Sequence, residues 1–134
     1  MTGFPLRIVT PDGIRFDGIA QQLNVRTTTG DIAIMARHSN YVAPLGMGEA
    51  SVVVDGQKRY AACIGGMVSV VDGVVTLVPT TFEWADQIDL ARAEASERRA
   101  EEILTGKYVS QLEQHLAEAR LKRALIRKNV AARK

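Results

Sequence analysis

Proline and glycine occupy almost only one part of this 134-residue chain. All four prolines and ten of the eleven glycines precede residue 88. Both residues mark turns and interrupt helices. The first part is therefore predicted to consist of short strands, and the last part, which has one glycine and no proline, to be helical. We expect two domains, residues 1–86 and 87–134.

Short runs of branched apolar residues recur through the first part, separated by turn signals. The pairs Asp55-Gly56 and Asp72-Gly73 are typical of two-residue hairpin turns, because both central positions of that turn need a positive φ. This spacing favours an antiparallel β-sandwich or barrel of seven or more strands. The apolar runs cover residues 6–10, 22–27, 31–35, 51–54, 59–64, 67–71 and 74–78.

The second part is typical of a helical hairpin. Asp89 can cap a first helix, Gly106 ends it, and Ser110 with Glu113 forms a capping box for a second helix. The second helix carries a thin apolar stripe interrupted at Arg123, so we expect weak and exchangeable packing between the helices. The stripe consists of Leu112, Leu116, Ala119, Ile126 and Val130.

Several classes of protein are excluded by composition. A single cysteine, Cys63, excludes a disulfide framework and a cysteine-rich metal site, and it is expected to be a small buried hydrophobe. The longest uncharged stretch, residues 60–71, is too short to span a bilayer. No N-terminal signal is evident, so a cytoplasmic chain is expected. The net charge of +2 is too small for bulk nucleic-acid coating.

Catalysis is not expected from the residues present. His38 and His115 lie in different parts of the chain, and neither has a neighbouring cysteine or a Ser/Asp arrangement. No phosphate-binding loop of the Gly-x-x-x-x-Gly-Lys-[Ser/Thr] type occurs. A hydrolase that uses Asp31 and His38 is the weakest alternative.

Two pairs of arginines in the second part are candidates for binding an anion. Arg92 and Arg99 are seven residues apart, and Arg123 and Arg127 are four apart, so each pair shares a helix face. In an antiparallel hairpin the four guanidinium groups could converge, and a polyphosphate would relieve their repulsion. The alternative is a solvated face with helical salt bridges to Glu94, Glu97, Glu101 and Glu102.

The C-terminal stretch, residues 119–134, holds seven basic residues and no acid. It could bind nucleic acid, an anionic membrane or an acidic protein. No aromatic residue follows Tyr108 to stack on bases, which favours the acidic protein. A free-standing sandwich that binds an anion or nucleic acid through the basic hairpin remains the alternative.

Several strings in this order are similar to those of one family. Over nearly its full length the chain resembles the epsilon subunit of bacterial F-type ATP synthase. Residues 9–13 (VTPDG), 30–34 (GDIAI), 42–45 (VAPL) and 88–93 (IDLARA) carry the resemblance. The family's Leu-Pro-Gly-His loop is replaced here by Met35-Ala36-Arg37-His38.

The resemblance implies a sandwich of about ten strands that binds the gamma subunit and the membrane rotor ring, with Asp31, Arg37 and His38 at the contact. It implies a non-catalytic, peripheral chain at the cytoplasmic face of the plasma membrane. The hairpin would switch between a compact and an extended state. When it is extended, basic residues of the second helix would reach the alpha/beta headpiece and block ATP hydrolysis: Arg120, Lys122, Arg123, Arg127 and Lys128.

The resemblance also implies that ATP, with or without Mg²⁺, binds as a regulatory ligand and favours the compact state. Ile88, Asp89 and Ala93 would contact the base and ribose. The phosphates would contact arginines of both helices, with Glu83 nearby; these arginines are Arg92, Arg99, Arg123 and Arg127.

Overall fold

The computed structural model describes residues 2–106 and 110–133. The chain divides into two compact units, Met1–Trp84 and Ala85–Lys134, here called the sandwich and the hairpin unit. The described strands of the sandwich are β1 (Phe4–Thr10), β2 (Gly13–Ala20), β3 (Gln22–Thr27), β4 (Gly30–Met35), β5 (Tyr41–Pro44), β6 (Met47–Val54), β7 (Gln57–Ile64), β8 (Met67–Val71), β9 (Val74–Val78) and β10 (Thr81–Trp84).

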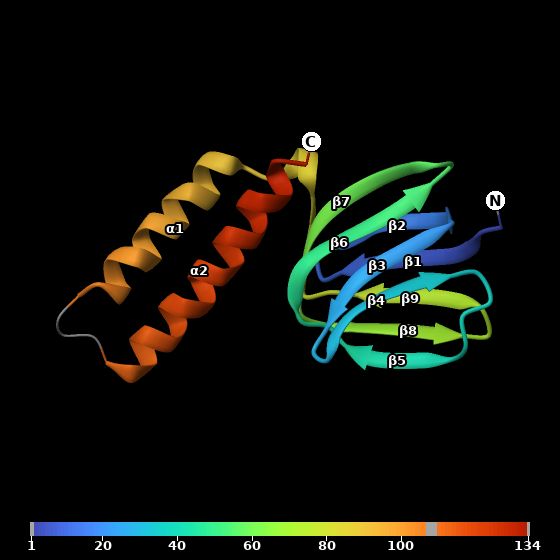
Figure 1. Ribbon diagram of the computed structural model, residues 1–134, viewed down its shortest axis with the longest axis horizontal. Coiled ribbons are helices and arrows are strands. Elements are labelled where there is room, and N and C mark those ends of the chain that lie inside the picture. The colour runs from blue at the N-terminus through green and yellow to red at the C-terminus, as the bar shows by residue number, and fades with distance from the viewer. Residues whose placement is uncertain (1, 107–109, 134) are drawn as a thin grey trace. The chain divides into compact units, whose positions relative to one another are not determined.

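The strands form two five-stranded sheets, which confirms the predicted β-sandwich (Figure 1). One sheet has the order β2-β1-β9-β8-β5, and the other has the order β10-β7-β6-β3-β4. Neighbouring strands are antiparallel except β1 and β9, which pair in parallel. Alternate residues of both sheets form the core between them, including Leu6, Ile8, Leu23, Ile34 and Leu77.

The Asp-Gly turns adopt the predicted geometry. Asp55 and Gly56 have φ values of 51° and 78°, and Asp72 and Gly73 have 50° and 81°. Positive φ at both central residues is the signature of the type I′ turn, whose twist matches that of the strands it joins. These turns place β6 against β7 and β8 against β9.

The hairpin unit contains a short 3₁₀ turn (Ala85–Gln87) and two helices, α1 (Leu90–Leu104) and α2 (Gln111–Ala131). Both predicted caps are present: Asp89 accepts a hydrogen bond from the Arg92 amide, and Ser110 accepts one from the Glu113 amide. Each cap satisfies an amide that has no partner within the helix.

The residues that α2 buries match the predicted stripe only in part: Val130 is buried, and Ala119 and Ile126 are half-buried. Leu112 and Leu116 are 68% and 61% exposed. Small residues are buried in their place, spaced by seven along each helix: Ala93 and Ala100 on α1, and Ala117, Ala124 and Ala131 on α2. Alanine at a helix contact lets the two backbones approach closely.

Within the described residues, no helix is long and apolar enough to cross a membrane. The Cys63 side chain is buried in the core of the sandwich, as expected. Burial raises the pKa of its thiol to about 12.

Candidate functional site

The two helices of the hairpin run antiparallel (Figure 1). The Lys128 ammonium of α2 donates a hydrogen bond of 3.2 Å to the Glu97 carboxylate of α1. Near the C-terminal end of α1, Ile103 lines a hollow of about 150 Å³ together with residues of α2. The α2 residues that line the hollow are Glu113, Leu116, Ala117 and Arg120.

The hollow and the Glu97–Lys128 ion pair lie on opposite long sides of the hairpin, because Ile103 and Glu97 are six residues apart on α1. On α1, Arg99 and Arg92 precede Ile103 by four and eleven residues, which are whole turns, so they share the side of the hollow. On α2, residues three and seven beyond Arg120 share that side for the same reason. We call this side the arginine edge; its arginines are Arg92, Arg99, Arg120, Arg123 and Arg127.

Acidic residues are concentrated on the other side of α1. Glu94 and Glu101 lie three and four residues from Glu97, so they share its side of the helix. The Glu97–Lys128 ion pair joins the two helices on that side. Among the described residues, the side chains of Arg92, Arg99, Arg120 and Arg123 form no ion pair. The arginine edge therefore offers several guanidinium groups to an anion.

The remaining residues predicted to bind ATP are placed as follows. Ile88 and Ala93 are buried at the start of α1, with exposures of 3% and 0%, and Asp89 caps that helix. Glu83 lies in β10 and is half-buried. Seven of the eight predicted residues thus belong to the hairpin unit, whereas Glu83 belongs to the sandwich.

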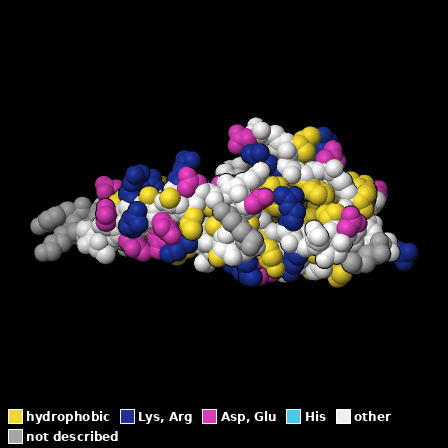
Figure 2. All heavy atoms as spheres, turned by 90° about the horizontal axis from the view of Figure 1, so that it is seen from above, with side chains coloured by type: hydrophobic (Ala, Val, Ile, Leu, Met, Phe, Trp, Pro, Cys, Tyr) yellow, Lys and Arg dark blue, Asp and Glu magenta, His cyan; other side chains and the backbone are white. Residues whose placement is uncertain are grey.

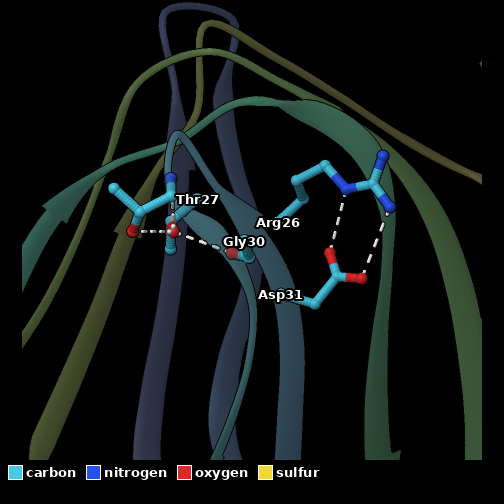
Figure 3. Close-up of polar contacts among 5 residues, drawn as sticks. Arg26, Thr27, Gly30 and Asp31 are labelled. Atoms are coloured by element: carbon cyan, nitrogen blue, oxygen red, sulfur yellow. Dashed lines mark hydrogen bonds and ion pairs between the residues drawn. The ribbon is translucent and has the colours of Figure 1, made fainter.

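Asp31, predicted to contact partner subunits, is held by a residue that sequence analysis missed. The Arg26 guanidinium donates two hydrogen bonds of 2.9 and 3.3 Å to the Asp31 carboxylate across the β3–β4 pair (Figure 3). The hydrogen bond from Arg26 lowers the pKa of Asp31, and Asp31 raises that of Arg26. The Thr27 hydroxyl donates to the Gly30 carbonyl and fixes the adjoining turn.

Arg37 and His38 lie beyond the other end of β4. About 13 Å of extended strand separates Asp31 from Met35, at roughly 3.3 Å per residue. The structure therefore does not bring Asp31 and His38 together as a catalytic pair. The His38 ring contacts Tyr41 edge-on at 5.9 Å, and its Nδ1 lies 2.7 Å from the Ser39 carbonyl oxygen. Asp31 therefore lies at the start of β4, whereas Arg37 and His38 lie in the loop that follows the end of that strand.

Arg37 adopts an unusual backbone conformation. Its φ is 66°, and it follows Ala36 in a turn closed by a hydrogen bond from the His38 amide to the Met35 carbonyl. This left-handed conformation favours glycine. The arginine that departs from the family's Leu-Pro-Gly-His pattern therefore occupies a position suited to the glycine it replaces.

A second surface of the sandwich is apolar and exposed. Residues of β8 and β9 that face away from the core pair across the strands, Met67 with Val78 and Val71 with Val74, and each is 44–52% exposed. Val42 of the adjoining β5 is 63% exposed. We call these five residues the valine face; its sequence signal was an apolar residue at each end of 67–71 and of 74–78, on the same face as Ser69 and Thr76. Figure 2 views the molecule from the top of Figure 1, whereas β5 and β8 lie at the bottom of the sandwich there; it shows further hydrophobic side chains on that other surface of the sandwich.

The basic residues of α2 predicted to be inhibitory differ in their accessibility. Arg120, Lys122 and Arg123 are exposed, whereas Arg127 and Lys128 are half-buried. Lys128 is engaged by Glu97 in this hairpin. Lys122 follows Arg120 by two residues, which places it away from the arginine edge.

Known proteins match both units of this chain. A family model described as the beta-sandwich domain of the ATP synthase delta/epsilon chain matches residues 3–85, and one for the long alpha-helix domain of that chain matches residues 86–132. An ATP synthase epsilon chain of Ruminococcus albus is 44% identical over 100% of both chains. One of Caldanaerobacter subterraneus is 38% identical over 97% of this chain and 94% of the relative.

The fold has a counterpart in a solved assembly. A chain of the Euglena gracilis mitochondrial ATP synthase, in a structure of OSCP/F1/c-ring, superposes with a TM-score of 0.84 at 20% identity, covering 100% of this chain and 83% of that one. At this identity the structural match shows the fold alone, whereas the family models and the bacterial relatives show the family to which the chain belongs. The chain belongs to the delta/epsilon chain family of ATP synthases.

Proposed function

We propose that this chain is the epsilon subunit of a bacterial F-type ATP synthase, a non-catalytic subunit of the central stalk. The observation that carries the proposal is the 44% identity over 100% of both chains to the epsilon chain of Ruminococcus albus. In this role the sandwich binds the gamma subunit and the rotor ring. The chain is then peripheral to the cytoplasmic face of the plasma membrane, where it is held by the complex.

The valine face supports attachment of the sandwich to the gamma subunit. Exposed apolar patches on a small domain mark surfaces that bind protein. Val71 and Val74 pair at the end of the β8–β9 ribbon, where a partner would remove both side chains from water. Arg37 and His38 lie in the loop that leads into β5, the strand beside β8, so they would add polar contacts.

Co-purification with the gamma subunit tests this attachment. Val74→Asp places a charge on the valine face and should abolish stoichiometric recovery of gamma, because an unpaired charge is costly to bury. Gln57→Asp introduces the same group at an exposed position of β7, in the other sheet, and should leave recovery intact. Equal recovery with both variants would exclude the valine face.

The arginine edge supports ATP as a regulatory ligand. Arg92, Arg99 and Arg123 are exposed, lie on one side of two antiparallel helices and form no ion pair within the described residues. Their repulsion is offset when a polyphosphate accepts bidentate hydrogen bonds from them. A ligand that contacts both helices binds only while the hairpin is closed, and it therefore stabilises the compact state.

Two neighbouring arginines provide a matched test of ATP binding. Arg99 lies on the arginine edge, whereas Arg98 is turned away from it by about 100°, and both are exposed. In calorimetric titrations of the full chain with ATP, with and without Mg²⁺, Arg99→Ala should weaken binding about ten-fold or more. Arg98→Ala, which removes an equal charge, should change the affinity little. Equal losses would indicate a diffuse electrostatic effect.

The exposed basic residues of α2 support the inhibitory role toward the alpha/beta headpiece. Positive charge on this helix would steer it toward acidic surfaces. Because Lys122 lies off the arginine edge, Lys122→Glu should raise ATP hydrolysis by the assembled synthase without altering ATP binding to this chain. Lys58→Glu on the sandwich makes the same charge change and should leave hydrolysis unchanged. An unchanged rate in Lys122→Glu would exclude that lysine from the contact.

A further inference from the structure

Arg120 belongs to the arginine edge, although it was not placed from the sequence among the arginines expected to bind phosphate. It lines the hollow of about 150 Å³ together with Ile103 of α1 and with Leu116 and Ala117 of its own helix. Within the described residues its side chain forms no ion pair. Its guanidinium is thus available beside a recess that is lined by apolar side chains and by the carboxylate of Glu113.

The register of the helices gives Arg120 a position relative to the predicted nucleotide. Glu97 meets Lys128, and Ile103 shares the hollow with Arg120, so α2 numbers fall as α1 numbers rise. If the base lies at the start of α1, the phosphates extend past Arg92 toward Arg99. Arg120 then lies opposite Ile103, one turn or about 5.4 Å beyond Arg99.

We infer that Arg120 is a specificity-determining residue that contacts the terminal phosphate of ATP and distinguishes ATP from ADP. The inference rests on the nucleotide site proposed above. A diphosphate is shorter by the group that Arg120 would reach, so ADP keeps its contacts with the earlier arginines and loses this one. Bidentate donation to the terminal phosphate makes the contact charge-assisted and geometrically specific.

Glu113 places a negative charge beyond the last arginine of the arginine edge. It lines the same hollow, seven residues or about 10 Å before Arg120 along α2. A phosphate chain that extended beyond Arg120 would approach this carboxylate and be repelled. The order of charges along α2 therefore favours a triphosphate over longer polyphosphates.

Calorimetry with two nucleotides tests the inference. The dissociation constants of ATP and of ADP are measured for the wild-type chain, Arg120→Ala and Lys122→Ala. Arg120→Ala should weaken ATP about ten-fold or more and change ADP by less than about two-fold, the difference expected from one charge-assisted hydrogen bond. Lys122→Ala removes the same charge from the same helix and should leave the preference for ATP unchanged.

The possible failures are distinguishable. A wild-type chain that binds neither nucleotide refutes the proposed ATP site, and this inference with it. A wild-type chain that binds ATP, with the same ATP-to-ADP ratio in Arg120→Ala, refutes the inference alone. Arg120→Lys keeps the charge and the helix propensity while losing the bidentate geometry. It should therefore fall between wild type and alanine, and a ratio for this variant outside that range also refutes the inference.

Discussion

Replacing Gly66 by alanine should destabilise the sandwich more than any comparable change at an open turn. Gly66 precedes β8 with a φ of 96°, and an added Cβ would overlap the Val78 carbonyl oxygen and lie 2.6 Å from the Pro79 Cα. Those atoms belong to backbone, which cannot move aside as a flexible side chain can. Accommodation requires the Met67–Val78 pairing to open.

The expected loss combines two terms. A left-handed backbone costs an L-residue about 1–2 kcal/mol, and forcing an extra carbon into a packed site costs about 1–3 kcal/mol. Gly66→Ala should therefore lower the free energy of unfolding by about 2–5 kcal/mol, a large part of the roughly 5–15 kcal/mol typical of a small domain. Gly73→Ala isolates the first term, because Gly73 has a φ of 81° and no atom within 4 Å of an added Cβ.

Urea unfolding provides the assay, with the single tryptophan of the chain as reporter. Trp84 is buried in the sandwich, where its ring packs edge-on against Phe82 at 4.9 Å, so its fluorescence reports this unit. Gly73→Ala should lose only about 1–2 kcal/mol. If the two variants lose equal stability, the close approach of Gly66 to Val78 and Pro79 has no energetic consequence, and the reasoning is refuted.

Three further predictions follow from burial and charge. In Arg26→Ala, NMR titration should show the pKa of Asp31 rising toward its ordinary value, and an unchanged titration would contradict the role given to Arg26. The stability that this ion pair contributes is present above the pKa of Asp31 in the unfolded chain. It is lost as the pH falls through the lowered pKa of Asp31 in the folded chain. Cys63 should resist a thiol-reactive reagent at pH 8 until denaturant unfolds the sandwich, because its pKa of about 12 leaves almost no thiolate. Ala100→Leu should destabilise the closed hairpin by about 1–3 kcal/mol through overpacking, measured as faster amide exchange in α2, whereas Ala95→Leu at an exposed position of α1 should not.

Elements with strong local signals could be predicted from the sequence. Asp-Gly turns specify their own backbone, and the helix caps act within three residues, so both were found where expected. β2, β5 and β10 were not identified from apolar runs. β5 has four residues including Pro44, β2 is interrupted by Gly18 and Asp17, and β10 is only four residues long. Such strands form because their neighbours in the sheet pair with them.

The buried face of α2 illustrates what the sequence pattern could not decide. Leu112 and Leu116 belong to a regular apolar stripe, yet both are exposed, whereas the alanines at 117, 124 and 131 are buried. Both stripes have helical spacing, so periodicity alone favours the larger side chains. Ala93 and Ala100 of α1 are buried with the same seven-residue spacing. Small residues at a helix contact allow the two backbones to approach closely, which the apolar pattern of α2 alone does not reveal.

In the candidate site, too, the arrangement within one helix was predictable from the sequence, whereas the arrangement between elements was not. The helical period places Arg92 with Arg99 and Arg123 with Arg127 without any tertiary information. The contribution of Arg120 depends on the register between the helices, and the Arg26–Asp31 pair depends on strand pairing. Neither relation is encoded locally.

Amide hydrogen exchange of the full chain with and without ATP tests the central claim most directly. If ATP binds only the closed hairpin, ATP at about 100 times its dissociation constant raises the free energy of opening by about 2.7 kcal/mol. Exchange that requires opening should then slow about 100-fold across Leu90–Leu104 and Gln111–Ala131, while the ten strands remain unchanged. Unchanged exchange in both helices under saturating ATP, or protection confined to the sandwich, would contradict the account.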